Sequence, residues 1–259
     1  MSKKYDRFIH QIIPLIIPVL LILTWIYTTK NEEITTSLFP SPQKVLSSFI
    51  ELSKSGELLN NILISSARAF TGFAIGGGIG FALGFVNGLS RTSEKVLDST
   101  IQMIRNIPHL AIIPLVILWF GIDVKAKLIL ISLGVFFPIY LNTFHGIRSI
   151  DPGLIEMGKV YGLKRFNLFK EVILPGALPS ILVGIRQSLG IMWLTLIVAE
   201  TVAADSGIGY MAMNARELML MDVIVLSIIV YAILGKLSDV VAKILEHKLL
   251  QWHPNFKKA

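Results

Sequence analysis

Long apolar runs separated by shorter polar segments dominate this chain, and only the last two runs contain charged residues, Arg186 in one and a few charges in the second half of the other. Six runs approach or exceed the roughly 20 helical residues that cross a hydrocarbon layer about 30 Å thick. They are residues 9–27, 69–90, 106–122, 128–147, 172–199 and 223–245. An open sheet edge has no hydrogen-bond partner in lipid, and the runs are far longer than barrel strands. The pattern therefore predicts an all-α integral membrane protein with about six transmembrane helices.

The first run follows Lys3, Lys4 and Arg7, and no small-residue cleavage pattern comes after it, so we predict an uncleaved first span. The two long polar segments, 28–68 and 148–171, are expected to carry interactions. In the first of these, apolar residues recur at helical spacing from Val45 to Leu52. This spacing predicts a short amphipathic surface helix.

Composition and charge agree with a membrane class. Of 259 residues, 53% are hydrophobic and 16% charged, against about 45–50% and about 25% in soluble proteins. The net charge of +7 would suggest nucleic acid in a soluble protein, but in a membrane protein its distribution reports topology. With a cytoplasmic N-terminus, fifteen Lys and Arg lie on the cytoplasmic side and seven on the other. We therefore expect both termini in the cytoplasm and no nucleic-acid partner.

The sequence contains no complete pattern that is typical of catalysis or of cofactor binding. There is no cysteine, and the five histidines have no metal-ligand spacing. A dinucleotide-binding pattern, G-x-G-x-x-A, occurs at Gly207, Gly209 and Ala212, but no strand-forming segment precedes it. A Gly-Lys pair occurs at Gly235 and Lys236, but it is not preceded by the glycine-rich phosphate-binding loop of nucleotide sites. We predict no metal, no cofactor, no nucleotide site and no enzymatic activity in this chain.

A glycine ladder marks the second run. Its members are four residues apart and fall on nearly one helical face, where a second backbone can approach closely. They are Gly72, Gly76, Gly80, Gly84 and Gly88. The ladder predicts helix packing, either inside one subunit, which we favour, or at a seam between two subunits.

The polar loop 151–175 has the signals of an ordered helix pair. Pro152 suits a helix start, Glu156 brings negative charge to the first turns, and Gly162 is placed to end the helix. A second short helix is expected from about Phe166 until Pro175 introduces the fifth span. The loop is therefore predicted to project from the membrane as a basic helix pair.

This loop resembles the EAA loop of ATP-binding-cassette (ABC) importer permeases, E-A-A, three residues, G, nine residues, I-x-L-P. The acid, glycine, leucine and proline are kept, whereas methionine and glycine replace the alanines and valine replaces isoleucine. The motif positions are Glu156, Met157, Gly158, Gly162, Val172, Leu174 and Pro175. The resemblance extends over residues 38–252. Among the importer permeases, the sequence is similar in particular to the aliphatic sulfonate permeases, which belong to a group that also serves taurine and nitrate.

The resemblance implies a type I ABC importer (MetI-like) permease of the plasma membrane. It implies two permease chains in the lipid bilayer, which we expect to form a homodimer. It also implies two ATPase subunits that bind ATP and Mg, and an extracytoplasmic solute-binding protein. Residues 1–65 would form an N-terminal transmembrane helix and external segment, and 66–259 the permease core. The ATPase-coupling residues would be Glu156, Gly158, Gly162, Leu174 and Pro175.

The expected function is ATP-driven import of aliphatic sulfonates. Taurine, nitrate or another small anion is the alternative solute. A channel or secondary transporter would also have six spans but would not need the EAA spacing, and a membrane enzyme would need a reactive constellation that we do not find.

Charged and bent positions in the spans are candidates for a substrate pathway. Arg186 lies deep in the fifth run, where insertion costs about 2.5–3.5 kcal/mol, so it needs a partner or water. It either faces the pathway and attracts a sulfonate, with Trp193 on the same route, or forms a structural pair. Glu200 either joins the pathway or pairs with Arg216.

The entrance of the third run adds three further pathway candidates: Arg105, Asn106 and Pro108. Pro108 and Pro114 remove helical hydrogen bonds there and permit a bend. A bent helix at this point could act as a gate.

Overall fold

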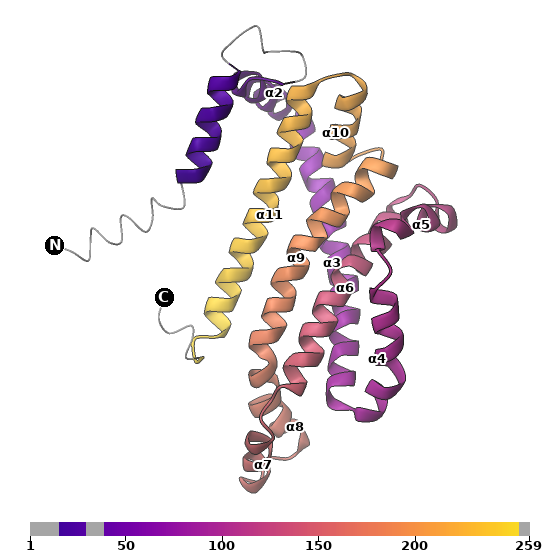
Figure 1. Ribbon diagram of the computed structural model, residues 1–259, viewed down its shortest axis with the longest axis vertical. Coiled ribbons are helices and arrows are strands. Elements are labelled where there is room, and N and C mark those ends of the chain that lie inside the picture. Colours follow the sequence, from indigo (N-terminus) through magenta and orange to yellow (C-terminus); the bar gives the residue numbers. More distant parts are fainter. Residues whose placement is uncertain (1–15, 30–38, 254–259) are drawn as a thin grey trace, which may run out of the picture. The chain divides into compact units, whose positions relative to one another are not determined.

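The computed structural model describes residues 16–29 and 39–253, and within them every regular element is a helix (Figure 1). An apolar helix, Ile16–Thr28, comes first. The remaining elements include one 3₁₀ segment, η1, and one π segment, η2. In chain order they are α2 Pro42–Lys54, α3 Glu57–Leu89, α4 Arg91–Arg105, η1 His109–Ile112, α5 Ile113–Phe120, α6 Val124–Arg148, α7 Pro152–Val160, α8 Arg165–Leu168, η2 Phe169–Ile173, α9 Leu174–Ala203, α10 Ile208–Glu217 and α11 Met221–Leu249.

Four helices in the described part of the chain are long and apolar enough to cross a membrane. They are Glu57–Leu89, Val124–Arg148, Arg165–Val202 and Met221–Leu249. A bent pair, Arg91–Arg105 with Leu110–Phe120, gives a fifth if it is counted as one span. The predicted all-helical membrane fold is confirmed. The predicted first span, 9–27, lies partly outside the described residues.

The bend predicted for the span over residues 106–122 is a complete break in the helix. α4 already ends at Arg105, and the axis turns by 76° before the segment that ends at Phe120. Pro108 has no N–H to donate and disfavours a helical conformation at the residue before it, which accounts for the break. The segment is a broken span or a re-entrant loop.

The chain divides into two compact units. One comprises Met1–Asn60 with Met211–Ile229, and the other Asn61–Tyr210 with Val230–Ala259. In the first unit, the predicted amphipathic surface helix is confirmed as α2. Ser41 caps it by accepting a hydrogen bond from the backbone N–H of Lys44, and its side chains Val45 and Ser48 are buried.

In the second unit, the glycine ladder of α3 packs against α6. A Cβ atom at Gly80 would lie 2.6 Å from the carbonyl oxygen of Phe136, and one at Gly84 would lie 2.6 Å from that of Tyr140. Such distances leave no room for a side chain, so the two backbones approach as closely as they do only because these residues are glycine. In this structure the ladder is a contact within one chain.

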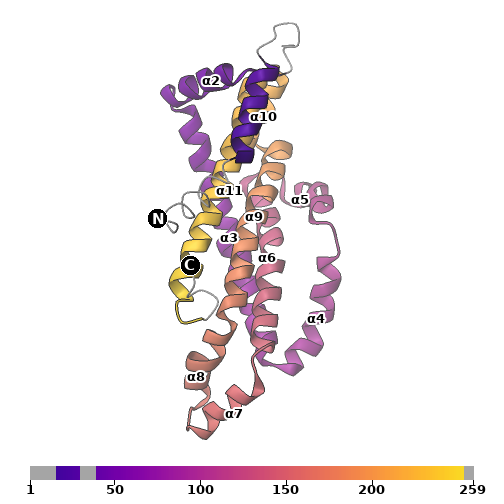
Figure 2. The ribbon, with the colours of Figure 1, turned by 60° about the vertical axis from the view of Figure 1, so that its left-hand side comes forward.

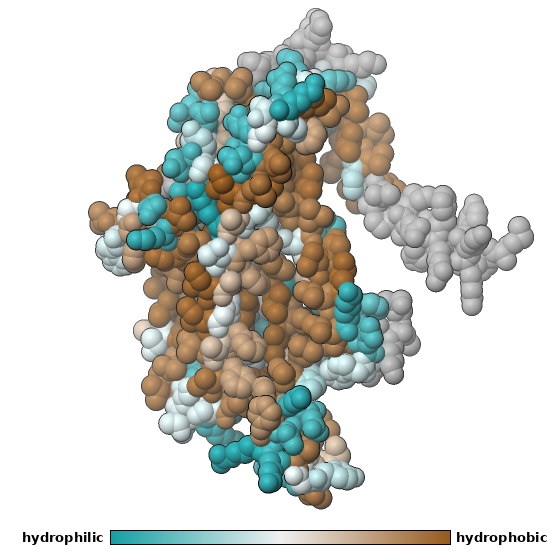
Figure 3. All heavy atoms as spheres, turned by 180° about the vertical axis from the view of Figure 1, so that it is seen from behind, coloured by the Kyte–Doolittle hydropathy of each residue, from teal (hydrophilic) through white to brown (hydrophobic). Residues whose placement is uncertain are grey.

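α6 and α9 lie side by side in both ribbon views, and α7 and α8 project beyond their ends (Figures 1 and 2). Figure 3 shows mostly apolar side chains over the long helices of this unit and hydrophilic ones gathered at the end that carries α7. The distribution matches helices immersed in lipid that end in a loop outside it.

Candidate functional site

α7, the first helix of the 151–175 loop, begins and ends as its sequence predicts. Asp151 accepts a hydrogen bond from the backbone N–H of Gly153 at 2.8 Å, which caps α7. At the other end the N–H of Leu163 donates to the carbonyl of Gly158 at 3.0 Å, and that of Gly162 to the carbonyl of Lys159 at 2.9 Å. With Gly162 at φ +80°, this is a Schellman motif, so glycine is needed there for its backbone conformation.

Gly158 is needed for a different reason, which is close packing. It is buried, and a Cβ atom there would lie 2.6 Å from Cδ1 of Leu168 on α8. α7 therefore rests directly on α8. Ile155 of α7 also packs against the buried cluster that includes Ile150, so α7 is attached to the core.

The expected end of the second short helix at Pro175 is wrong. α8 passes through the π segment Phe169–Ile173 directly into α9, and residues Arg165–Val202 form one long helix. Pro175 has no N–H to donate into the preceding turn, and a π segment is one way in which a helix accommodates a lost hydrogen bond. The loop is thus continuous with a membrane span, which the proline signals did not reveal.

Large apolar side chains are exposed at the tip of the loop. Val160 is 86% exposed, Tyr161 80% and Phe166 74%, and the neighbouring carboxylate of Glu156 is exposed as well. A cavity of about 530 Å³ lies beside α7, lined by residues that include Met157, Val172, Pro175 and Trp252. Exposed apolar groups at an otherwise polar end are typical of a protein–protein interface.

Glu200 is the centre of what we call the buried network. The carboxylate is 1% exposed and accepts hydrogen bonds from Ser65 Oγ, Arg68 Nη1, Gly209 N and Tyr231 O–H, all at 2.8–3.0 Å. Arg68 also donates to the carbonyl oxygen and the hydroxyl of Ser206. Both carboxylate oxygens are therefore satisfied by protein groups.

The turn after α9 closes over this carboxylate. Gly207 adopts φ +107°, and a Cβ atom there would overlap the Glu200 carboxylate. At the exposed Asp205, hydrogen bonds from its own backbone N–H and from the Ser206 hydroxyl hold the pKa of the carboxyl below its ordinary value. The predicted pairing of Glu200 with Arg216 is wrong, because its partner is Arg68. The sequence marked Arg68 only as a loop charge.

A second set of charges, which we call the α9–α11 cluster, joins two span helices. Arg186 Nε lies 2.7 Å from Asp239 Oδ1, and Arg186 Nη1 lies 3.5 Å from Glu246 Oε2. Lys243 Nζ and Lys236 Nζ lie 3.0 Å and 3.7 Å from Asp239 Oδ2. The Arg186 side chain has carboxylate partners and is still 39% exposed. Neither lysine was predicted as a site residue.

Trp193 is a core residue in this structure. Its indole N–H donates to Ser238 Oγ at 2.8 Å, and its ring packs edge-on against Phe70 and Tyr231. It borders a small apolar cavity of about 220 Å³ between α3, α9 and α11. Trp193 and Arg186 thus lie in different surroundings.

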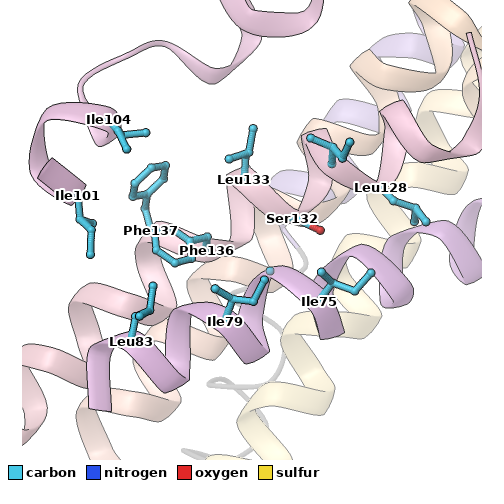
Figure 4. Close-up of a pocket in the computed structure, with 12 residues that line it drawn as sticks. Ile75, Ile79, Leu83, Ile101, Ile104, Leu128, Ser132, Leu133, Phe136 and Phe137 are labelled. Carbon is cyan, nitrogen blue, oxygen red and sulfur yellow. The ribbon is translucent and has the colours of Figure 1, made fainter. Parts of the chain in front are cut away.

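Arg105, Asn106 and Pro108 lie at the exposed end of α4, where the backbone N–H of Asn106 closes the last turn. Beside α4 is an apolar pocket of about 510 Å³, lined by α3, α4 and α6 (Figure 4). Ile101 and Ile104 enter it from α4, and Phe136 and Phe137 from α6. Among the described residues, no group of three or more His, Asp or Glu could hold a metal ion.

The profile of the family described as "Binding-protein-dependent transport system inner membrane component" matches residues 74–251. The chain belongs to this family. It is therefore a multi-pass inner-membrane permease subunit of an ABC importer, without catalytic activity of its own, and its family works with ATPase and binding-protein partners. The importer identity predicted from the 151–175 loop is confirmed.

Two relatives share the description "Putative aliphatic sulfonates transport permease protein SsuC". The one from Escherichia coli (strain K12) is 54% identical, over 99% of this chain and 97% of its own. The one from Bacillus subtilis (strain 168) is 44% identical, over 94% and 88%. The taurine transport system permease protein TauC of Escherichia coli (strain K12) is 34% identical, over 90% and 86%.

Two solved structures share the fold. An amino acid ABC transporter crystallised with histidines matches with a TM-score of 0.64 at 16% identity, over 77% of this chain and 97% of that one. The MetNI methionine ABC transporter in an inward-facing conformation matches with a TM-score of 0.56 at 19% identity, over 72% and 95%. These matches confirm the predicted type I importer fold.

Proposed function

We propose that this permease imports aliphatic sulfonates, driven by an ATPase that acts on the 151–175 loop. One observation supports this coupling: the loop continues directly into a span helix and also packs against the core. Its exposed apolar tip leads through Gly158 and Leu168 into the unbroken helix Arg165–Val202. Force applied to the tip therefore reaches a membrane span without passing through a flexible joint.

In this proposal α7 sits in a groove of the ATPase. Glu156 and the apolar tip make the contact, and Gly158 and Gly162 keep α7 compact against α8. Leu174 and Pro175 begin the span that is moved. The assembly contains a second copy of the permease, two ATPase subunits that bind ATP and Mg, and an external binding protein. Both termini of this chain lie in the cytoplasm. The core lies within residues 66–259.

The proposed solute rests on relatives and on charge. Two relatives named for aliphatic sulfonates are 54% and 44% identical, whereas the one named for taurine is 34% identical. The exposed side of Arg186 would attract the anionic headgroup, and the bend at Arg105, Asn106 and Pro108 would serve as a gate. Trp193 and Glu200 are buried, so we assign them to the walls of the pathway.

The coupling is tested by Glu156→Ala and Gly162→Leu in the complete transporter in proteoliposomes. We expect uptake of butanesulfonate to fall at least tenfold in each, because the first loses a contact and the second cannot adopt the φ of the α7 turn. Lys54→Ala, on α2, serves as control. Unchanged uptake in both loop variants, with the ATPase still bound, would exclude the coupling role.

The solute is tested by competition with butanesulfonate uptake. Unlabelled alkanesulfonates should compete at lower concentration than taurine or nitrate. If taurine or nitrate competes better, the alternative small-anion solute is favoured. Uptake that continues after the ATPase is removed would instead indicate a channel or a secondary transporter.

A further inference from the structure

Three cations in the α9–α11 cluster share one carboxylate. Arg186, Lys236 and Lys243 all lie within 4 Å of Asp239, and Glu246 contacts only Arg186. Three positive charges against two negative ones leave a formal excess of one positive charge. The lysines also project outward, since the side chain of Lys236 is 69% exposed and that of Lys243 is 50% exposed.

The depth of Lys236 makes this exposure informative. It lies near the middle of the apolar run 223–245, and at 1.5 Å per residue it is roughly 13 Å of helix from the nearer end. A lysine near the end of a span can extend its amine to the interface, but one at this depth must find water or protein. Charged residues inside spans almost always face the bundle interior or a water-filled cavity. The exposed side of the cluster therefore needs water or protein, and not lipid, in the assembled transporter.

The donors at this face are suited to an oxyanion. A lysine ammonium has three N–H donors. Lys243 Nζ lies 3.0 Å from Asp239 Oδ2, whereas Lys236 Nζ, at 3.7 Å, forms an ion pair longer than a hydrogen bond, so each lysine keeps at least two donors. Arg186 is held by Asp239 at Nε and by Glu246 at Nη1, so its Nη2 has no partner among the described residues. The carboxylates therefore orient the cations without using all their donors.

We propose that Arg186, Lys236 and Lys243 form a binding site for the sulfonate group of the solute on the exposed face of α9 and α11. This inference deepens the proposed function and rests on it. Asp239 holds the three cations together while the site is empty. An arriving sulfonate accepts hydrogen bonds from the free donors and supplies the missing negative charge, with no change of covalent bonds.

The first test uses the absence of cysteine from this chain. In the complete transporter, Val240→Cys introduces the only thiol of the permease and keeps all three cations. Val240 is 40% exposed and lies within one helical turn of both Lys236 and Lys243. The thiol is treated with the anionic reagent sulfonatoethyl methanethiosulfonate and with its cationic trimethylammonium counterpart. Leu237→Cys, at an exposed apolar neighbour outside the cluster, is the matched control.

We expect the Val240→Cys thiol to react at least tenfold faster with the anionic reagent than with the cationic one, after each rate is divided by the rate of the same reagent with a free thiol. Butanesulfonate should slow that reaction, and the Leu237→Cys thiol should show neither effect. No reaction at position 240 would mean that water does not reach this face. Reaction without charge preference or protection would mean water without an anion site. Either result would overturn the inference.

The second test measures maximal uptake of butanesulfonate with the external binding protein at saturation. The double variant Lys236→Gln with Lys243→Gln should lose at least tenfold in rate, and Lys236→Arg with Lys243→Arg should stay within threefold. Lys248→Gln, farther along α11, should match the wild type. If the wild type imports no sulfonate, the proposed function fails. If it does and the double Gln variant equals it, only the sulfonate site is excluded.

Discussion

The buried network and the α9–α11 cluster both join an arginine to a carboxylate between helices of the same unit, but they leave different amounts of charge available. Glu200 is 1% exposed and receives four kinds of protein donor. Asp239 is 29% exposed at its side chain and is shared by three cations. In the first set every hydrogen-bonding atom of the carboxylate is used inside the protein, whereas in the second some donors remain unused.

The difference shows how similar residues serve different purposes. A charge removed from water must be paired and hydrogen-bonded, or its burial costs several kcal/mol. The buried network meets this requirement and so fixes the turn after α9. In the α9–α11 cluster the charges are only partly paired and hydrogen-bonded within the protein. The remaining donors are consistent with a face that binds water or an anion.

The largest expected effect comes from removing the central carboxylate of the buried network. Glu200→Ala removes the buried partner of Arg68 and leaves it only the exposed carboxylate of Asp205, at 3.8 Å, so the free energy of unfolding should fall by about 3–5 kcal/mol. Denaturant unfolding of the purified permease in detergent measures it. The double variant Arg68→Leu with Glu200→Leu should be less destabilised than Glu200→Ala. Equal losses would show that the unpaired charge is not the cause.

A smaller loss is expected from a single donor to the same carboxylate. Tyr231→Phe removes the hydroxyl that lies 3.0 Å from Glu200 Oε2, and hydrogen bonds to charged groups contribute about 1.5–3 kcal/mol. Tyr210→Phe, at an exposed tyrosine, should change the free energy of unfolding little. If the two variants unfold alike, the Tyr231 hydroxyl adds no stability to the network.

Packing between α3 and α6 can be tested at two neighbouring glycines of α3. A Cβ atom at Gly76 would overlap the backbone of Ser132, whereas one at Gly78 would meet nothing within 4 Å. Gly76→Ala should lower the free energy of unfolding by about 1–3 kcal/mol. Gly78→Ala should leave it equal or slightly higher, because alanine favours the helix. The same loss at both positions would contradict the close α3–α6 contact.

The smallest effect on stability is expected in the α9–α11 cluster. Asp239→Asn should change the free energy of unfolding by no more than about 1 kcal/mol, since partly exposed ion pairs contribute little. The same change should speed the reaction of the anionic reagent with the Val240→Cys thiol, because a negative charge is removed. A loss of stability as large as that of Glu200→Ala would erase the contrast between the two clusters.

Local signals in the sequence were enough for the parts that local interactions control. Pro152, Gly162 and the apolar spacing after Pro42 predicted α7 and α2, because caps and periodicity act within one helix. The break after Arg105 was anticipated only as a bend, since the strength of a proline break depends on what the neighbouring helices provide. The π segment before Pro175 gave no recognisable sequence signal.

By itself the sequence determined the membrane class, the main spans, the loop that resembles the importer motif and the family. These follow from hydrophobicity and short-range order, which act along the chain. Only the tertiary structure decided that the glycine ladder meets α6, that Glu200 pairs with Arg68, and that Arg186 shares Asp239 with two lysines. Arg68 and Glu200 are separated by 132 positions in the sequence, and Arg186 and Asp239 by 53. Which charges pair depends on how the helices pack, because a charge in an apolar interior pairs with the partner that packing brings within reach.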